Sequence, residues 1–194
     1  EAAGLRSELA ALNRGVFLGT AVIPGDAAAP LIELRPGDTF LRLGHAYAVP
    51  ATLLEAVNPS LNPRDLRPGT GVKVVRGPFH ALFRKGARRM DVYARDIYVE
   101  SMPAEVAEGD FLAQGTYRVK RGAKIKVQRR EWIGLEPLAV SPDATGGEGP
   151  AGPVWIYGTA GPRRGRLGAP GTGVEVADSD LSELSNVLAE GRSL

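Results

Sequence analysis

Two histidines and no cysteine limit the chemistry open to this chain of 194 residues. The absence of cysteine excludes disulfide bonds, thiolate metal sites and every enzyme that uses a cysteine nucleophile. Two histidines are too few for a histidine-rich metal centre. His80 could pair with Asp91 across two neighbouring strands, but a hydrogen-bonded structural histidine fits the same position. His45 falls on an expected helix, where we expect it to face solvent.

Other groups with catalytic or metal-binding potential have plainer interpretations. The serines considered as nucleophiles are Ser141, Ser179, Ser182 and Ser185, and none of them lies in a G-x-S-x-G elbow. Asp178, Asp180 and Glu183 lie near the start of an expected helix, where acidic residues cap the helix and interact favourably with its dipole. We therefore expect no metal site and no cofactor.

The densest run of charge is basic and lies between residues 118 and 130. It consists of Arg118, Lys120, Arg121, Lys124, Lys126, Arg129 and Arg130. Residues 78–130 carry 12 basic against 6 acidic groups, and residues 131–194 carry 4 against 9, so the two segments can pair within one domain. Few aromatic residues accompany the cluster, which disfavours nucleic acid as a partner. A solvated strand face, or an anionic wall polymer as partner, are the other interpretations.

Composition indicates a globular protein with many turns. Hydrophobic residues make up 43% of the chain and charged residues 24%, with a net charge of only +2. The 25 glycines and 15 prolines favour turns and short strands over long helices. No run of 18 apolar residues occurs, so we expect no transmembrane segment, and the first residues lack the pattern of a secretion signal.

The first 75 residues contain the clearest pattern of elements. Residues 4–14 predict a short helix with Leu5, Leu9 and Leu12 on one face and Gly15 as its end. A linker is expected over residues 27–30. Strands over 31–34 and 72–75 then enclose two helices, the first capped by Asp38 or Thr39 and the second beginning at Pro50 and ending at Asn58-Pro59.

The rest of the chain predicts short strands and one closing helix. The expected strands are 81–83, 90–93, 97–101, 116–120, 124–128, 154–157 and 174–176. Residues 141–153 and 161–173 are expected to be surface loops. The helix over 178–190 should bury Leu181, Leu184, Val187 and Leu188, with Gly191 as its end.

Residues 32–75 resemble a lysin motif (LysM) domain. The resemblance rests on Pro36-Gly37-Asp38-Thr39-Phe40, Tyr47-Ala48-Val49, Leu54 followed by Asn58-Pro59, and Leu66-Arg67-Pro68-Gly69 before Val72-Lys73-Val74. Ile32 departs from the family, in which an aromatic residue is common there. Members of this family bind glycans that contain N-acetylglucosamine, such as peptidoglycan or chitin. The resemblance implies glycan-binding positions at Gly37, Asp38, Thr39 and Phe40 and at Asn58, Pro59, Ser60, Leu61 and Asn62. The same residues also suit turns, a helix cap and a small core.

Residues 78–190 resemble the L,D-transpeptidase catalytic domain. The resemblance rests on Gly77-Pro78-Phe79-His80-Ala81, Met90-Asp91-Val92-Tyr93, Ile97-Tyr98-Val99-Glu100-Ser101, Leu112–Val119, Glu131–Leu135, Ile156–Thr159 and the tail from Val174. That family acts through a cysteine in Ser/Thr-x-Gly-Cys-x-Arg, with a histidine upstream. Alignment places the cysteine on Gly173, the serine on Pro170, the arginine on Glu175 and the histidine on Tyr157. Acyl transfer needs a thiolate, a base and oxyanion donors. Because Gly173 and Tyr157 replace the cysteine and the histidine, these departures from the family motif imply a domain without catalysis.

The sequence therefore predicts an α+β protein with a small βααβ LysM module and a mainly-β domain that ends in a helix. The expected divisions are an N-terminal helix and linker over 1–30, the LysM module over 31–76 and the L,D-transpeptidase-like domain over 77–194. The resemblances imply a non-catalytic cell-envelope protein, periplasmic or in the cell wall, with peptidoglycan or another N-acetylglucosamine glycan as partner. The alternatives are an L,D-transpeptidase-type enzyme with a displaced nucleophile, and a scaffold whose degenerate pocket recruits an envelope protein.

Overall fold

The computed structural model describes residues 2–106, 112, 114–127, 130–140, 154–159 and 173–188. Within these ranges the chain is α+β, with four α-helices and nine strands, as the sequence predicts. It forms two compact units, and the first contains the residues up to Leu82 together with Asp91–Ser101 and Asn186–Leu188. The expected limits at residues 31 and 77 stay a prediction. The two expected loops and Pro170 lie outside the described residues, except that Gly173 begins a strand.

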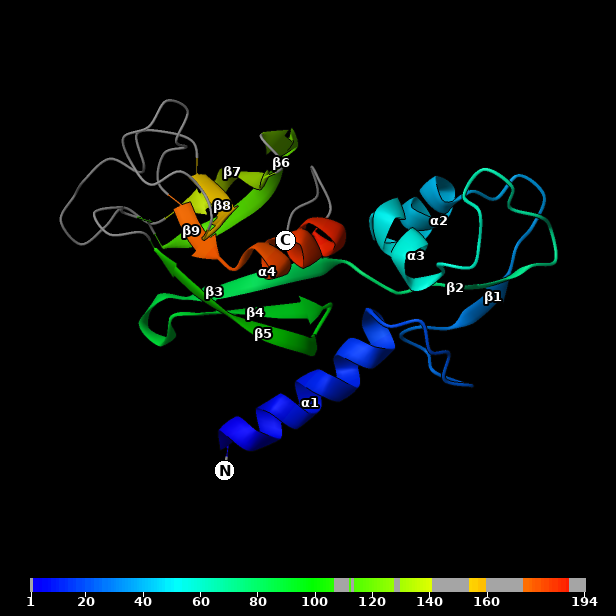
Figure 1. Cartoon of the computed structure of the whole chain (residues 1–194), viewed down its shortest axis with the longest axis horizontal. Helices are drawn as coiled ribbons and strands as arrows, with labels where there is room; N and C mark the ends of the chain where they lie inside the picture. The colour runs from blue at the N-terminus through cyan, green and yellow to red at the C-terminus, as the bar shows by residue number, and fades with distance from the viewer. Residues whose placement is uncertain are drawn as a thin grey trace. The chain divides into compact units, whose positions relative to one another are not determined.

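A strand–helix–helix–strand module is the centre of the first unit. Its elements are β1 (Leu31–Glu33), α2 (Phe40–Tyr47), α3 (Ala51–Val57) and β2 (Gly71–Lys73). β1 and β2 pair antiparallel, with Leu31 opposite Lys73 and Glu33 opposite Gly71. Figure 1 shows the two helices together on one side of this strand pair. The predicted order of elements is confirmed, and each strand is one residue shorter than expected.

Local residue chemistry explains where the helices of the module begin and end. The Thr39 hydroxyl accepts a hydrogen bond from the Arg42 N–H at 3.2 Å, which identifies Thr39 as the cap of α2. Ala48, with φ +59°, ends α2 in a left-handed conformation that a non-glycine residue rarely adopts. Pro50 precedes α3 and Asn58 follows it, as expected. Buried side chains from both helices, and from β2 and the residue that follows it, form the module's core: Phe40, Leu43, Leu53, Leu54, Val57, Val72 and Val74.

Helix α1 (Ala2–Phe17) is longer than the sequence predicts, because it continues past Gly15. A helical glycine costs roughly 1 kcal/mol relative to alanine. Burial of Phe17, which is 2% exposed and packs edge-on against Phe79 at 6.2 Å, offsets that cost. Leu5, Leu9 and Leu12 do share one face of the helix, and that face is exposed.

A seven-stranded sheet contains the remaining strands. They are β3 (Phe79–Arg84), β4 (Arg89–Ala94), β5 (Ile97–Val106), β6 (Gly115–Val127), β7 (Arg130–Val140), β8 (Val154–Gly158) and β9 (Gly173–Val176). Their order in the sheet is β3-β4-β5-β9-β8-β7-β6, so β9 lies between β5 and β8. β9 pairs antiparallel with β5 and parallel with β8.

The strands predicted over 116–120 and 124–128 are wrong in detail, and β7 is missing from the prediction. The segments 116–120 and 124–127 belong to the single strand β6, with a register shift between Val119 and Lys124, and residue 128 lies outside the described residues. Gly122, with φ +71°, lies at that irregularity and allows the strand to continue through it. β7 pairs with β6 on one side and β8 on the other.

Helix α4 (Asp178–Val187) follows β9, as predicted. Leu181, Leu184, Val187 and Leu188 are all buried, which confirms the expected apolar face. Asp178 and Asp180 lie in its first turn, where acidic residues are stabilised by the helix dipole. Among the described residues, no helix has the length and apolar character needed to cross a membrane.

Candidate functional site

Two loops of the first unit contain eight of the nine residues to which the LysM resemblance assigns glycan contacts, and the ninth, Phe40, begins α2. One connects β1 to α2 over residues 34–39, and the other connects α3 to β2 over residues 58–70. They are joined at their bases, because the Leu34 N–H donates to the Thr70 carbonyl at 2.9 Å and the Gly69 N–H donates to the Leu34 carbonyl at 2.8 Å. The expected adjacency of residues 37–40 and 58–62 stays a prediction.

The first loop is held by its own polar groups. The Asp38 carboxylate accepts the Arg35 N–H at 2.8 Å, and the Arg42 guanidinium donates to the Gly37 carbonyl at 2.8 Å. Gly37 has φ +82°, a conformation that favours glycine. Phe40 is 3% exposed and belongs to the core. Of the four residues that the resemblance assigns here, Gly37 and Thr39 are therefore exposed and Asp38 is half-buried.

The second loop is anchored by Asn58, whose side chain is buried and fully engaged. Its amide nitrogen donates to the Leu54 and Lys73 carbonyls, both at 2.8 Å, and its oxygen accepts the Lys73 N–H at 2.9 Å. These bonds join the last turn of α3 to β2. Asn58 thus positions the loop, while Pro59, Ser60 and Asn62 are exposed and Leu61 is half-buried.

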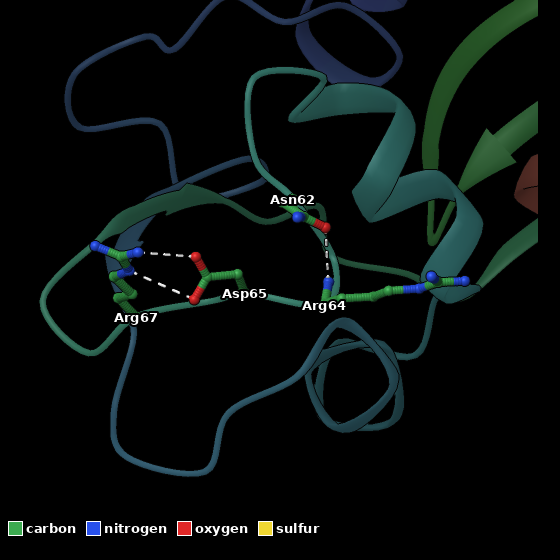
Figure 2. A network of polar contacts seen from close by, with 4 residues as sticks. All are labelled: Asn62, Arg64, Asp65 and Arg67. Atoms are coloured by element: carbon green, nitrogen blue, oxygen red, sulfur yellow. Dashed lines mark hydrogen bonds and ion pairs between the residues drawn. The ribbon is translucent and has the colours of Figure 1, made fainter.

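Beyond these residues, a short polar network shapes the rest of the second loop (Figure 2). The Asn62 side-chain oxygen accepts the Arg64 N–H at 3.0 Å, which closes a local turn. Arg67 donates to both carboxylate oxygens of Asp65, at 2.9 and 3.4 Å. The Arg64 side chain extends away from the other three residues (Figure 2). The loop is thereby ordered largely by contacts within itself.

Lys73 has a buried ammonium group, whereas the sequence pattern predicts only that it lies in the strand over residues 72–75. It is 1% exposed, and its ammonium group donates to the Gly19 and Ala21 carbonyls at 2.6 and 2.7 Å. Burial lowers the pKa of Lys73, and the charge of Asp26 partly offsets that shift. This residue fastens the segment after α1 to β2. A single lysine within the apolar run 72–75 was the signal that could have identified it.

The positions that align with the L,D-transpeptidase catalytic residues lie on β8 and β9. Tyr157 is opposite Glu175, and Trp155 is opposite Gly173, in the parallel register of the two strands. The Tyr157 ring lies 5.8 Å from that of Trp132, which in turn meets Trp155 edge-on at 6.3 Å. A Cβ atom at Gly173 would lie 2.3 Å from the Trp155 carbonyl oxygen and 2.8 Å from the Tyr157 ring. Aromatic packing therefore fills the place in which the resemblance would put a nucleophile.

The suggested pair of His80 and Asp91 has a different arrangement. The His80 ring stacks on Tyr93, with centroids 5.3 Å apart and planes at 10°. Asp91 is 0% exposed, accepts the Ser101 hydroxyl at 2.5 Å and lies 3.6 Å from the Arg6 guanidinium. These contacts support the structural interpretation of His80.

The pKa of His80 predicts a small pH effect on stability. Burial lowers this pKa below its ordinary value of 6.5, and Asp96 partly opposes the shift. As the pH falls from 6.5 through the lowered pKa, the unfolded chain binds a proton more readily than the folded protein, so stability decreases. Urea unfolding of the wild type and of His80→Asn across this range should show that the free energy of unfolding decreases less in the variant as the pH falls. Identical slopes would contradict the assignment.

The basic run on β6 is in part paired with acidic and polar groups of the same unit. Arg118 forms an ion pair with Glu136 on β7, and the Lys124 ammonium donates to the Ser185 carbonyl at 2.5 Å. Lys120 and Arg121 are exposed. The pairing of residues 118 and 136 agrees with the expected attraction between the basic and the acidic segment.

Comparison with known proteins identifies no relative from which the roles of these residues could be inferred. No family model matches the chain, and no curated protein matches it. A solved structure described as "Structure of Bdellovibrio bacteriovorus Bd1075" matches 60% of this chain with a TM-score of 0.40 and 18% sequence identity. The match spans 46% of that chain, less than half of its length. A likeness at this level supports no conclusion on fold or function.

Proposed function

We propose that the chain is a non-catalytic, cell-envelope protein that binds glycans containing N-acetylglucosamine, such as peptidoglycan, through its βααβ module. The single observation that carries this proposal is the pair of ordered loops, joined at Leu34, Gly69 and Thr70, with exposed residues at 37, 39, 59, 60 and 62. The resemblance of residues 32–75 to the LysM family supplies the class of ligand.

Order within the two loops favours binding by a small module. Asn58, Thr39 and Asp38 each hold backbone groups in place through hydrogen bonds within the module. A loop that is already ordered loses less conformational entropy when it binds, so more of the contact energy contributes to affinity. The N-acetyl and hydroxyl groups of a sugar can then meet backbone N–H and C=O groups, with Pro59 or Leu61 as apolar contact.

The proposal gives the seven-stranded sheet no catalytic part. The chain has no cysteine, and Tyr157, Gly173 and Glu175 occupy the positions that align with the family's histidine, cysteine and arginine. An imidazole base and a thiol are thus both missing from the place that needs them. The packing of Tyr157 and Trp155 around Gly173 supports a structural part for these residues.

Calorimetry of the full chain with chitopentaose tests the glycan proposal. We expect weak binding, with Kd on the order of 10–1000 μM, because a single small module buries little area. Ser60→Trp, at an exposed loop position, should weaken binding by about tenfold or more by obstructing the loops. Ser182→Trp, at an exposed position on α4, serves as the matched control and should bind as the wild type does.

Salt and peptidoglycan sedimentation separate this proposal from its rivals. Binding through mostly uncharged loops should survive a rise from about 0.1 M to 1 M salt, unlike binding by the basic strand β6. Absence of heat up to millimolar ligand would refute glycan binding by the module. Sedimentation with peptidoglycan that persists in Ser60→Trp would instead show that the peptidoglycan contacts lie elsewhere on the chain.

A further inference from the structure

Helix α1 contacts the other elements of the first unit through its polar side. Leu5, Leu9 and Leu12 are 64%, 46% and 70% exposed, although an amphipathic helix ordinarily packs its apolar stripe inward. Between Gly4 and Val16 no residue is fully buried, and Ala10, Asn13 and Val16 are the half-buried ones. Hydrophobic burial therefore contributes little to holding this part of the helix.

Charged and polar contacts join α1 to Asp91 of β4 and to Tyr98 and Glu100 of β5. Arg6 lies 3.6 Å from the Asp91 carboxylate and 5.5 Å from the Tyr98 ring centre, and Arg14 lies 3.4 Å from the Glu100 carboxylate. The Asn13 side chain donates to the Tyr98 carbonyl at 2.6 Å. The two arginine side chains are 43% and 57% exposed, while the side chains of Asp91 and Glu100 are 0% and 7% exposed, so salt reaches these ion pairs only from the arginine side.

The far end of the helix is fastened in a different way. Phe17 is 2% exposed against Phe79, and Lys73 binds the carbonyls of Gly19 and Ala21 directly after the helix. These contacts are buried, so salt screens them much less. Gly15, where an added Cβ would meet nothing within 4 Å, lies between the two kinds of attachment.

We propose that residues 4–14 form a salt-releasable arm, which detaches from β4 and β5 while the anchor at Phe17 and Lys73 stays in place. Screening weakens the pairs of Arg6 and Arg14, and little apolar burial opposes release. An isolated helix of this length is marginal in water, so the released arm loses its helical hydrogen bonds. Release also uncovers Asp91, Glu100 and Tyr98 on the strands beneath.

Hydrogen exchange of the full chain, followed by mass spectrometry, measures this release. Raising NaCl from about 0.1 M to 1 M should speed exchange of peptides within residues 5–14 by about five- to tenfold, while residues 40–57 keep their protection. Arg6→Ala with Arg14→Ala should exchange fast over the arm at both salt concentrations. Retained protection over 40–57 shows that this variant has folded, and Asn13→Ala is a milder second variant with an intermediate expected effect.

A leucine variant provides the matched control. Leu5→Gln with Leu12→Gln alters the exposed face and leaves every named polar contact in place, so its arm should be protected at low salt and released at high salt. Exchange over residues 5–14 that ignores salt in the wild type would overturn the proposal. Full protection in the arginine variant, or loss of protection at low salt in the leucine variant, would overturn it as well.

Discussion

Replacing Gly173 with cysteine is expected to destabilise the protein by about 3 kcal/mol, the upper end of the usual cost of overpacking. The added Cβ would lie 2.3 Å from the backbone oxygen of Trp155, on the strand directly paired with β9. A backbone atom within a sheet cannot move aside as the end of a flexible side chain can. Urea unfolding measures the change, and Gly86→Ala, where a Cβ meets nothing within 4 Å, is the control expected to stay near the wild type.

The same variant tests whether one residue would restore the family's chemistry. We expect no stoichiometric adduct with a carbapenem by intact-mass spectrometry, either for the wild type or for Gly173→Cys. The wild type has no thiol, and an isolated thiol with a pKa of about 8.5 is mostly protonated at neutral pH. A wild-type adduct would reinstate the displaced-nucleophile hypothesis. A Gly173→Cys variant as stable as the wild type would contradict the packing argument.

Asn58→Ala is the second substitution with a large expected effect. It removes three buried hydrogen bonds and leaves the Lys73 N–H and C=O without their Asn58 partner. Buried groups that lose a partner cost about 1–3 kcal/mol each, so we expect a loss of about 2–4 kcal/mol in the free energy of unfolding. The change should also reduce the protection from hydrogen exchange of β2 and of the loop over residues 58–70.

Asn62→Ala is the matched control for this prediction. Asn62 lies in the same loop, is exposed, and its side chain accepts the Arg64 N–H. Because water can replace that partner, the loss should stay below about 1 kcal/mol. Equal losses for the two asparagines would show that Asn58 does not brace the module as the geometry indicates.

Turn and cap chemistry is the reason that the βααβ module could be predicted from the sequence. Thr39 and Pro50 act through neighbouring backbone groups, so their effect depends on few residues. The bonds that join Leu34 to Gly69 and Thr70 follow from the pairing of β1 with β2, which the order of elements predicts. The parts of Phe40 and Asn58 could not be assigned, because a side chain beside a loop can face either the core or the ligand.

Long-range packing decided the features that the sequence did not predict. Helical spacing groups Leu5, Leu9 and Leu12 on one face, but the partners of Arg6 and Arg14 on distant strands determine which face turns inward. β7 includes Gly134 and Pro137, which are rare in strands, and pairing on both sides stabilises it nonetheless. The aromatic packing around Gly173 likewise depends on β7 and β8, which are distant from Gly173 in the sequence.

The place of β9 between β5 and β8 links completion of the sheet to the timing of synthesis on the ribosome. The module closes once Lys73 has emerged, whereas β5 and β8 wait for residues 173–176. Until then both strands present unpaired edges, which can pair with other chains and aggregate. A nascent chain stalled or cut before Gly173 would thus contain a finished module and an unfinished sheet, and any shortened version of the protein should retain β9.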